Sequence, residues 1–96
     1  MPARKRLEWS PRAGSDLLAI ENFYADFSQI TADRVIAEIR RGALRLETCP
    51  AIGRPGQVRS TRELVIASYP FILVYRIVGS RIRVGRVLHQ HQKYPD

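Results

Sequence analysis

The chain has 96 residues, of which 16 are Lys or Arg and nine are Asp or Glu, so one small domain carries a net charge of +7. The only cysteine, Cys49, excludes an internal disulfide and favours a reducing cytoplasm. No apolar run approaches the ~20 residues that span a bilayer, and the basic start lacks the hydrophobic region of a signal peptide. The positive charge favours an acidic partner, which is a nucleic acid, an acidic protein or an anionic membrane surface.

The first half of the chain predicts a short strand followed by two helices. Residues 4–9 alternate polar and apolar side chains, which is typical of an edge strand, and Trp9 is expected to anchor the core. Ser10 and Pro11 suit the start of a helix that runs to about Ser28. Apolar side chains recur along it with helical spacing.

A second helix is expected to open at Thr31 as its N-cap. Only about two residues separate the two helices, which predicts an antiparallel helical hairpin. Its apolar stripe comprises Ala32, Val35, Ile36, Ile39, Ala43 and Leu46. The acidic residues of the hairpin show no catalytic pattern and are expected on solvated faces: Asp16, Glu21, Asp26 and Glu38.

Residues 48–57 form the one clear loop, because two Pro and two Gly interrupt both helix and strand. Arg54 lies between Gly53 and Pro55 on a constrained turn, where it is either a solvated side chain or an anion contact.

The C-terminal half predicts a meander of three strands. The first covers about residues 58–66 and places Arg62 on the face of Leu64 and Ile66, so Arg62 lies towards the strand end or is paired. The run 71–78 is almost continuously apolar, as in a central strand buried on both faces. Gly79 and Ser80 indicate a tight hairpin turn. In the last strand, strict alternation places one set of side chains on one face, namely Arg81, Arg83, Gly85, Val87 and His89, and the other set on the opposite face, namely Ile82, Val84, Arg86 and Leu88.

These elements predict an α+β fold in the order β-α-α-β-β-β, with an antiparallel sheet and the helical hairpin packed on one face. Residues 1–96 form a single domain, and the other face of the sheet is free to carry positive charge. From Arg54 onward, seven Arg and one Lys stand against Glu63 and Asp96 only. This basic set can bind phosphates or an acidic protein, and the sequence leaves both alternatives open.

Candidate chemistry is sparse. His89 and His91 have no Cys, His or Asp cluster beside them, so neither a metal nor a cofactor is expected. His89 suits general acid–base chemistry in RNA cleavage, although a surface histidine is the more ordinary reading.

Three segments carry a family resemblance: TREL at 61–64, YPFILVYRI at 69–77 and RVLHQHQKYP at 86–95. In this order and spacing they resemble the RelE/ParE superfamily of toxins from type II toxin–antitoxin systems. The likeness covers nearly the whole chain and is closest to the ParE-like, plasmid-stabilisation branch.

The resemblance implies two alternative activities. ParE-like toxins block DNA gyrase by protein contact, whereas RelE-like toxins cleave mRNA on the ribosome and commonly hold the scissile phosphate with an Arg. Ile72 stands at the corresponding position here, and an aliphatic side chain cannot stabilise the developing charge. We therefore expect a gyrase inhibitor. The alternatives are a ribosome-dependent mRNA endoribonuclease, with His89 as its catalytic residue, and a non-toxic basic nucleic-acid-binding module.

The resemblance also implies a cytoplasmic protein with a cognate antitoxin, whose flexible C-terminal segment folds onto the toxin. Promoter DNA would be bound only through the antitoxin. The expected contacts with the target or the antitoxin are Arg54, Arg62, Arg76, Arg83, Arg86, His89 and Tyr94.

Overall fold

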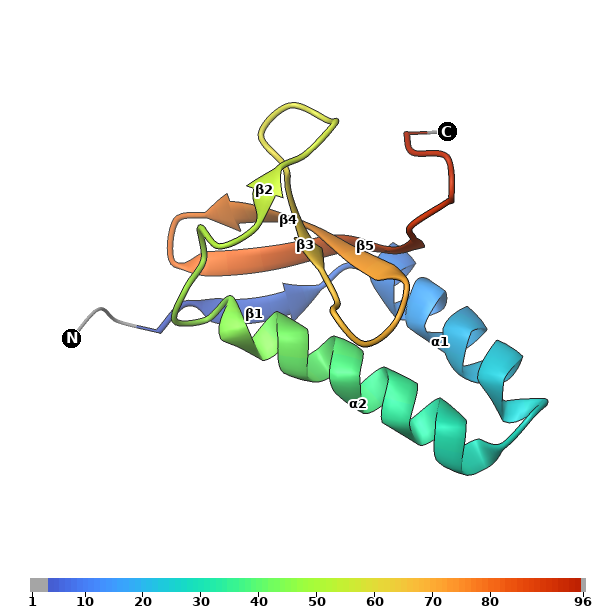
Figure 1. Cartoon of the computed structure of the whole chain (residues 1–96). Coiled ribbons are helices and arrows are strands. Elements are labelled where there is room, and N and C mark those ends of the chain that lie inside the picture. Colours follow the sequence, from blue (N-terminus) through green and yellow to red (C-terminus); the bar gives the residue numbers. More distant parts are fainter. Residues whose placement is uncertain (1–3, 96) are drawn as a thin grey trace.

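The computed structural model describes residues 4–95 as a sheet with two helices on one side (Figure 1). The elements in chain order are β1 (Arg6–Trp9), α1 (Pro11–Ala25), α2 (Gln29–Arg45), β2 (Arg54–Pro55), β3 (Arg62–Val65), β4 (Phe71–Val78) and β5 (Arg81–His89). The five strands are ordered β1-β5-β4-β3-β2. The predicted α+β class and the β-α-α-β-β-β order are confirmed, with β2 as an additional two-residue strand.

The sheet is mixed rather than wholly antiparallel. β1 pairs with β5 in parallel, from Arg6 beside Arg81 to Trp9 beside Val84, while every other pair of neighbouring strands is antiparallel. A parallel partner needs a long crossover connection. The helical hairpin and the three following strands provide that connection, so β1 lies at the sheet edge as predicted.

Both helices begin at serine caps. The Ser10 hydroxyl accepts a hydrogen bond from the Ala13 N–H, which confirms the predicted start of α1. α2 begins earlier than predicted, because Ser28 rather than Thr31 is its N-cap and the Ser28 hydroxyl accepts from the Thr31 N–H. The two helices pack against one another as the predicted hairpin.

The core lies between the helical hairpin and the sheet. The predicted stripe of α2 is confirmed, with Val35, Ile39 and Leu46 completely buried and Ile36 partly buried. From the sheet, the same cluster includes Leu73, Tyr75, Ile82, Val84 and Val87. Trp9 packs at its margin, with the Arg40 guanidinium 5.6 Å from the centre of the indole ring. This cation–π contact extends the anchoring role expected of Trp9.

β3 is shorter than the strand predicted for residues 58–66. Ser60 has a φ of 67°, in the left-handed region, and the Thr61 N–H bonds back to the Val58 carbonyl, so the chain turns before the strand begins. Arg62 consequently lies at the strand end, one of the two predicted alternatives, and Glu63 is the buried charged residue.

A β-bulge in β5 corrects the predicted faces of that strand. Val74 pairs with Arg86 but Tyr75 pairs with Val84, so Gly85 is the extra residue. A bulge inserts one residue and shifts the alternation beyond it. Val87 therefore joins Ile82 and Val84 in the core instead of sharing a face with Arg83.

The face of the sheet opposite the helices is partly covered. Val74 and Leu88 are only 2% and 4% exposed, although the second half of β4, from Arg76 to Val78, is exposed. The central strand is thus buried on both faces over its first half only. Two small hollows on this face are each lined by both Val74 and Tyr94. The C-terminal tail therefore lies over this face, on the side away from the helices (Figure 1). We call this surface the open face.

Candidate interaction surfaces

The loop before β2 is held by the buried Tyr75 side chain and the half-buried Arg62 side chain. The Tyr75 hydroxyl donates to the Pro50 carbonyl oxygen at 2.7 Å and accepts from the Gly53 N–H at 3.0 Å. The Arg62 guanidinium donates to the Gly53 carbonyl at 2.8 Å. Burial raises the pKa of Tyr75, and the Gly53 hydrogen bond and the Arg62 charge oppose that shift. Arg62, an expected partner contact, is thus used inside the chain to fix the loop.

Glu63 fixes the position of Arg54. The Glu63 carboxylate is 3.1 Å from Nη2 of Arg54 and accepts a hydrogen bond from the Gln57 N–H at 3.3 Å. Its side chain is buried, whereas Arg54 remains exposed. The structure therefore presents Arg54 at the rim of the open face in one orientation, beside a hollow of about 80 Å³ that Glu63 and Tyr94 also line.

Two further predicted residues meet directly on the sheet. Arg76 of β4 and Arg83 of β5 are register partners, and we call them the arginine pair. Both line a hollow of about 70 Å³ with Thr61, Val74 and Tyr94. Arg83 is 3.7 Å from the Glu8 carboxylate, which also contacts Arg81 at 3.4 Å, and Arg76 donates to the Arg59 carbonyl at 3.4 Å. The structure thus brings Arg76, Arg83 and Tyr94 together.

Arg86 lies elsewhere, in a pair with Asp16 of α1. Its Nε is 2.9 Å from Oδ2 of Asp16, and the two side chains are 12% and 16% exposed. The expectation that Asp16 lies on a solvated face is therefore wrong. The pair joins α1 to β5, which makes Arg86 an internal contact of the fold.

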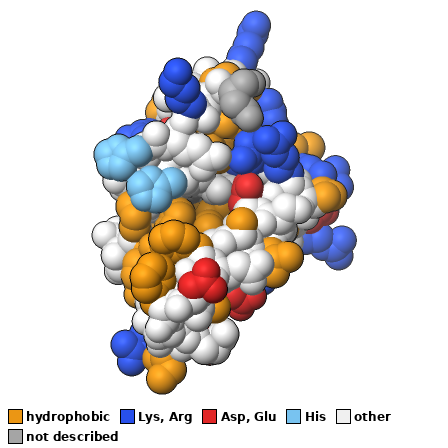
Figure 2. All heavy atoms as spheres, turned by 90° about the vertical axis from the view of Figure 1, so that its right-hand side faces the viewer, with side chains coloured by type: hydrophobic (Ala, Val, Ile, Leu, Met, Phe, Trp, Pro, Cys, Tyr) orange, Lys and Arg blue, Asp and Glu red, His pale blue; other side chains and the backbone are white. Residues whose placement is uncertain are grey.

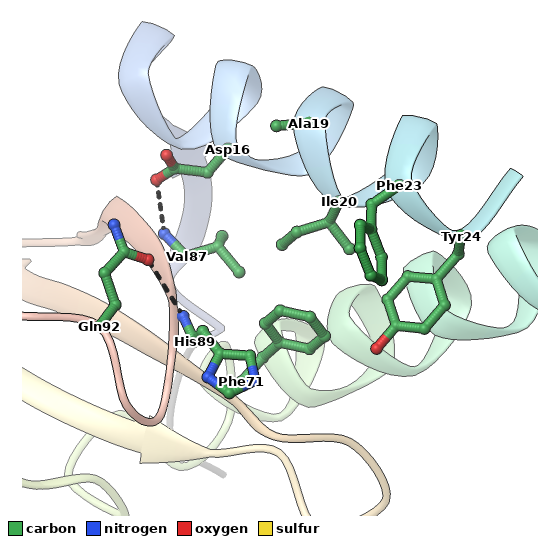
Figure 3. Close-up of a pocket in the computed structure, with 9 residues that line it drawn as sticks. All are labelled: Asp16, Ala19, Ile20, Phe23, Tyr24, Phe71, Val87, His89 and Gln92. Atoms are coloured by element: carbon green, nitrogen blue, oxygen red, sulfur yellow. Dashed lines mark hydrogen bonds between the residues drawn. The ribbon is translucent and has the colours of Figure 1, made fainter. Parts of the chain in front are cut away.

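An apolar groove that the sequence analysis did not predict lies between α1 and the ends of β4 and β5. It has a volume of about 370 Å³ and is lined by Asp16, Ala19, Ile20, Phe23, Tyr24, Phe71, Val87, His89 and Gln92 (Figure 3). Phe23 and Phe27 are 60% and 76% exposed and extend the apolar surface along α1. Hydrophobic side chains gather at the centre of this face, with the two histidines at their border (Figure 2). The only sequence signal was Phe23, Tyr24 and Phe27 on one helix, a pattern that core residues produce equally well.

His89 lies at the margin of this groove. Its ring makes an edge-to-face contact with Phe71 at 5.8 Å, and its Nδ1 accepts from the His91 N–H at 3.2 Å. His89 pairs with Phe71, whereas Ile72 pairs with Leu88 and faces the opposite side of the sheet. His89 also lines the hollow of about 80 Å³ beside Arg54, but it shares no hollow with the arginine pair.

Residues 4–95 contain neither a candidate metal site nor a candidate membrane-spanning helix. No group of three or more His, Cys, Asp or Glu side chains is placed to hold a metal ion in this part of the chain. Likewise, no helix within it is long and apolar enough to cross a membrane.

A family profile described as the ParE toxin of the type II toxin–antitoxin system parDE matches residues 7–94. The chain belongs to the ParE toxin family. It is 40% identical over 94 residues to the Sinorhizobium fredii protein Y4kP, whose name marks it as a candidate toxin, with 98% of this chain and 97% of that protein covered. It is 30% identical over 81 residues to toxin RelE2 of Caulobacter vibrioides, with 84% and 90% covered.

Solved structures agree with this ParE family assignment. A chain of the chromosomal ParDE toxin–antitoxin system of P. aeruginosa matches with a TM-score of 0.82 and 26% identity, over 90% of this chain and 96% of that one. A chain of the RelBE2 toxin–antitoxin complex of Mycobacterium tuberculosis shares the fold, with a TM-score of 0.70 and 17% identity over 96% and 98% of the two chains. The predicted membership of the RelE/ParE superfamily is confirmed.

Proposed function

We propose that this ParE-family chain is the toxin of a type II pair, inhibits DNA gyrase by protein–protein contact, and is neutralised by a cognate antitoxin in the cytoplasm. One observation carries the non-enzymatic part of the proposal, namely the separation of His89 from the arginine pair. RNA cleavage needs an acid or base within hydrogen-bond reach of the reacting oxygen and a cation at the phosphate. Here His89 shares no hollow with the arginine pair, and the one arginine that lines a hollow with it, Arg54, is already paired with the Glu63 carboxylate at 3.1 Å.

The surroundings of Ile72 support the same reading. Its register partners are Val65 and Leu88, so an aliphatic strip crosses the open face at the position where the family resemblance implies a phosphate-holding Arg. Val65 and Leu88 carry no charge that could replace that Arg. A surface with apolar and cationic parts is suited to contact with an acidic protein.

The groove is the surface that we propose for the antitoxin. Its lining is aromatic and aliphatic, and Phe23 and Phe27 leave large apolar areas in contact with water. Exposed apolar patches of this kind mark protein interaction sites. An amphipathic segment of the antitoxin would bury them with its apolar side, and acidic residues on the segment would complement the net charge of +7.

The experiment measures DNA synthesis and protein synthesis in a susceptible host after controlled expression of this chain without its antitoxin. We expect thymidine incorporation to fall before amino-acid incorporation, and purified toxin to inhibit supercoiling by gyrase. Addition of antitoxin should reverse the inhibition. An earlier fall in protein synthesis, with mRNA cleavage on ribosomes, would contradict the gyrase proposal.

The endoribonuclease is the second candidate, and the 30% identity to toxin RelE2 favours it. It requires that His89→Ala abolish mRNA cleavage. The nucleic-acid-binding module is the third, and it requires binding that is independent of sequence and weakens steeply with salt.

A further inference from the structure

We propose that Arg76 and Arg83 form a binding site for one carboxylate, supplied by an acidic side chain on the surface of the target protein. The inference rests on the proposed function, because it names the chemistry by which the open face recognises that target. Three observations support the site, namely the register of the two arginines, the shortage of carboxylate partners for them and the small hollow between them.

The register places two like charges opposite one another. Arg76 and Arg83 are direct cross-strand partners, an arrangement that destabilises a sheet. In the same row across the sheet, Glu8 of β1 is the register partner of Arg83, while Thr61, just before β3, lines the same hollow as Arg76. Glu8 is the one carboxylate in this row, and it is shared between Arg81 and Arg83. Within residues 4–95, Arg76 has no carboxylate partner, and its one hydrogen bond goes to the exposed Arg59 carbonyl.

The hollow between these residues suits a small anion. Its volume is about 70 Å³, and the two guanidinium-bearing residues share its lining with Val74, Thr61 and Tyr94. The Thr61 hydroxyl donates to the Val58 carbonyl and the Tyr75 hydroxyl to the Pro50 carbonyl, so the phenol of Tyr94 is the remaining neutral side-chain donor of the lining. Val74 is buried and Tyr94 half-buried, so an anion held there is partly withdrawn from water and attracted more strongly.

A carboxylate fits better than a nucleic acid. A guanidinium binds one carboxylate through two parallel hydrogen bonds. A nucleic acid strand would need several cations along a continuous path. Here Glu8 closes one end of the row, and Glu63 lines the adjoining hollow beside Tyr94. These carboxylates interrupt the positive charge on both sides of the arginine pair, which leaves a site that matches one acidic side chain.

The test uses the isotope-labelled full chain, separated from its antitoxin and refolded. A glutamate-rich peptide and a single-stranded DNA oligonucleotide of equal charge are titrated separately while backbone amide shifts are followed. We expect the peptide to shift amides around Arg76 and Arg83, and Arg76→Gln to weaken its binding about tenfold. Arg34→Gln removes an equal charge from an exposed position on α2 and is the matched control.

Stability gives a second readout with the opposite sign. Because Arg76→Gln removes a repulsion, we expect its thermal midpoint to rise by roughly 1–4 °C while binding falls. If the role of Arg76 were only structural, Arg76→Gln would lower both the thermal midpoint and the affinity for the peptide. The substitution leaves the contact between Arg83 and Glu8 in place.

Three results would overturn the site: no shifts around the arginine pair, tighter binding of the oligonucleotide through the same amides, or an equal loss in Arg34→Gln. Failure of the gyrase proposal can be distinguished from failure of the carboxylate site. Normal supercoiling with intact peptide binding would reject gyrase as the target and keep the carboxylate site. Inhibition of gyrase that Arg76→Gln and Arg83→Gln leave unchanged would reject the site alone.

Discussion

Asp16 and Arg86 stand 70 residues apart in the sequence and form a two-pronged ion pair that joins α1 to the bulge of β5. The same carboxylate accepts a hydrogen bond from the Val87 N–H at 2.9 Å, and the Ser10 hydroxyl donates to the Gly85 carbonyl at 2.8 Å. β1 ends at Trp9 while β5 continues to His89. Backbone groups at an uncovered sheet edge need partners. The start of α1 supplies them where β1 has ended.

Asp16→Asn should destabilise the fold by about 2–4 kcal/mol, because it removes the carboxylate charge that faces the largely buried Arg86 guanidinium at 2.9 Å. The measurement is urea unfolding of the purified chain. Asp26→Asn, at the exposed C-terminal end of α1, is the control and should change stability by less than about 0.5 kcal/mol. Equal effects of the two substitutions would show that the ion pair is dispensable.

Tyr75→Phe should cost about 1–3 kcal/mol, because it removes the partner of the buried Gly53 N–H and of the Pro50 carbonyl. The midpoint of urea unfolding at neutral pH measures this loss. Gly53→Ala should disturb the same loop, since an added Cβ would lie 2.6 Å from the Tyr75 hydroxyl. If neither substitution altered stability, the loop would not depend on this hydroxyl.

Tyr75 also predicts a dependence on alkaline pH. Burial raises its pKa in the folded chain above the ordinary value of 10.0, so the unfolded chain releases the phenolic proton more readily. The contribution to stability is complete below pH 10.0 and is lost as the pH rises from there through the folded-state pKa. The difference in unfolding free energy between the native chain and Tyr75→Phe should shrink over that range. A difference that stays constant would contradict this assignment.

Ala19→Arg should weaken antitoxin binding, because it places a charged side chain in the lining of the apolar groove. The affinity, measured by calorimetry with the cognate antitoxin, should fall at least about tenfold. Ala37→Arg makes the same change at an exposed position of α2 outside the groove and should leave the affinity unchanged. If Ala37→Arg had the larger effect, the antitoxin would bind on the α2 side instead.

His89→Ala should retain the inhibition of DNA synthesis, because His89 borders the groove and not the hollow of the arginine pair. The measurement is thymidine incorporation after expression without antitoxin. Loss of toxicity together with loss of mRNA cleavage would instead assign His89 to a ribonuclease site.

Much of the fold follows from local sequence alone. The alternation of 4–9, the serine before Pro11, the stripe of α2 and the turn at Gly79 each depend on neighbours a few residues away, and all four predictions are confirmed. The family resemblance rests likewise on short segments read in order. It is confirmed by the profile that matches residues 7–94.

The tertiary structure decided which charged residues remain available to a partner. Among the predicted arginines, Arg62 holds a loop and Arg86 pairs with Asp16, while Arg76 and Arg83 face one another. The bulge at Gly85 moved Val87 into the core, and the groove formed where α1 meets β5. Each of these outcomes depends on residues tens of positions apart. Periodicity reports only the face of a single element, so contacts of this kind exist only after the sheet has paired and the helices have packed against it.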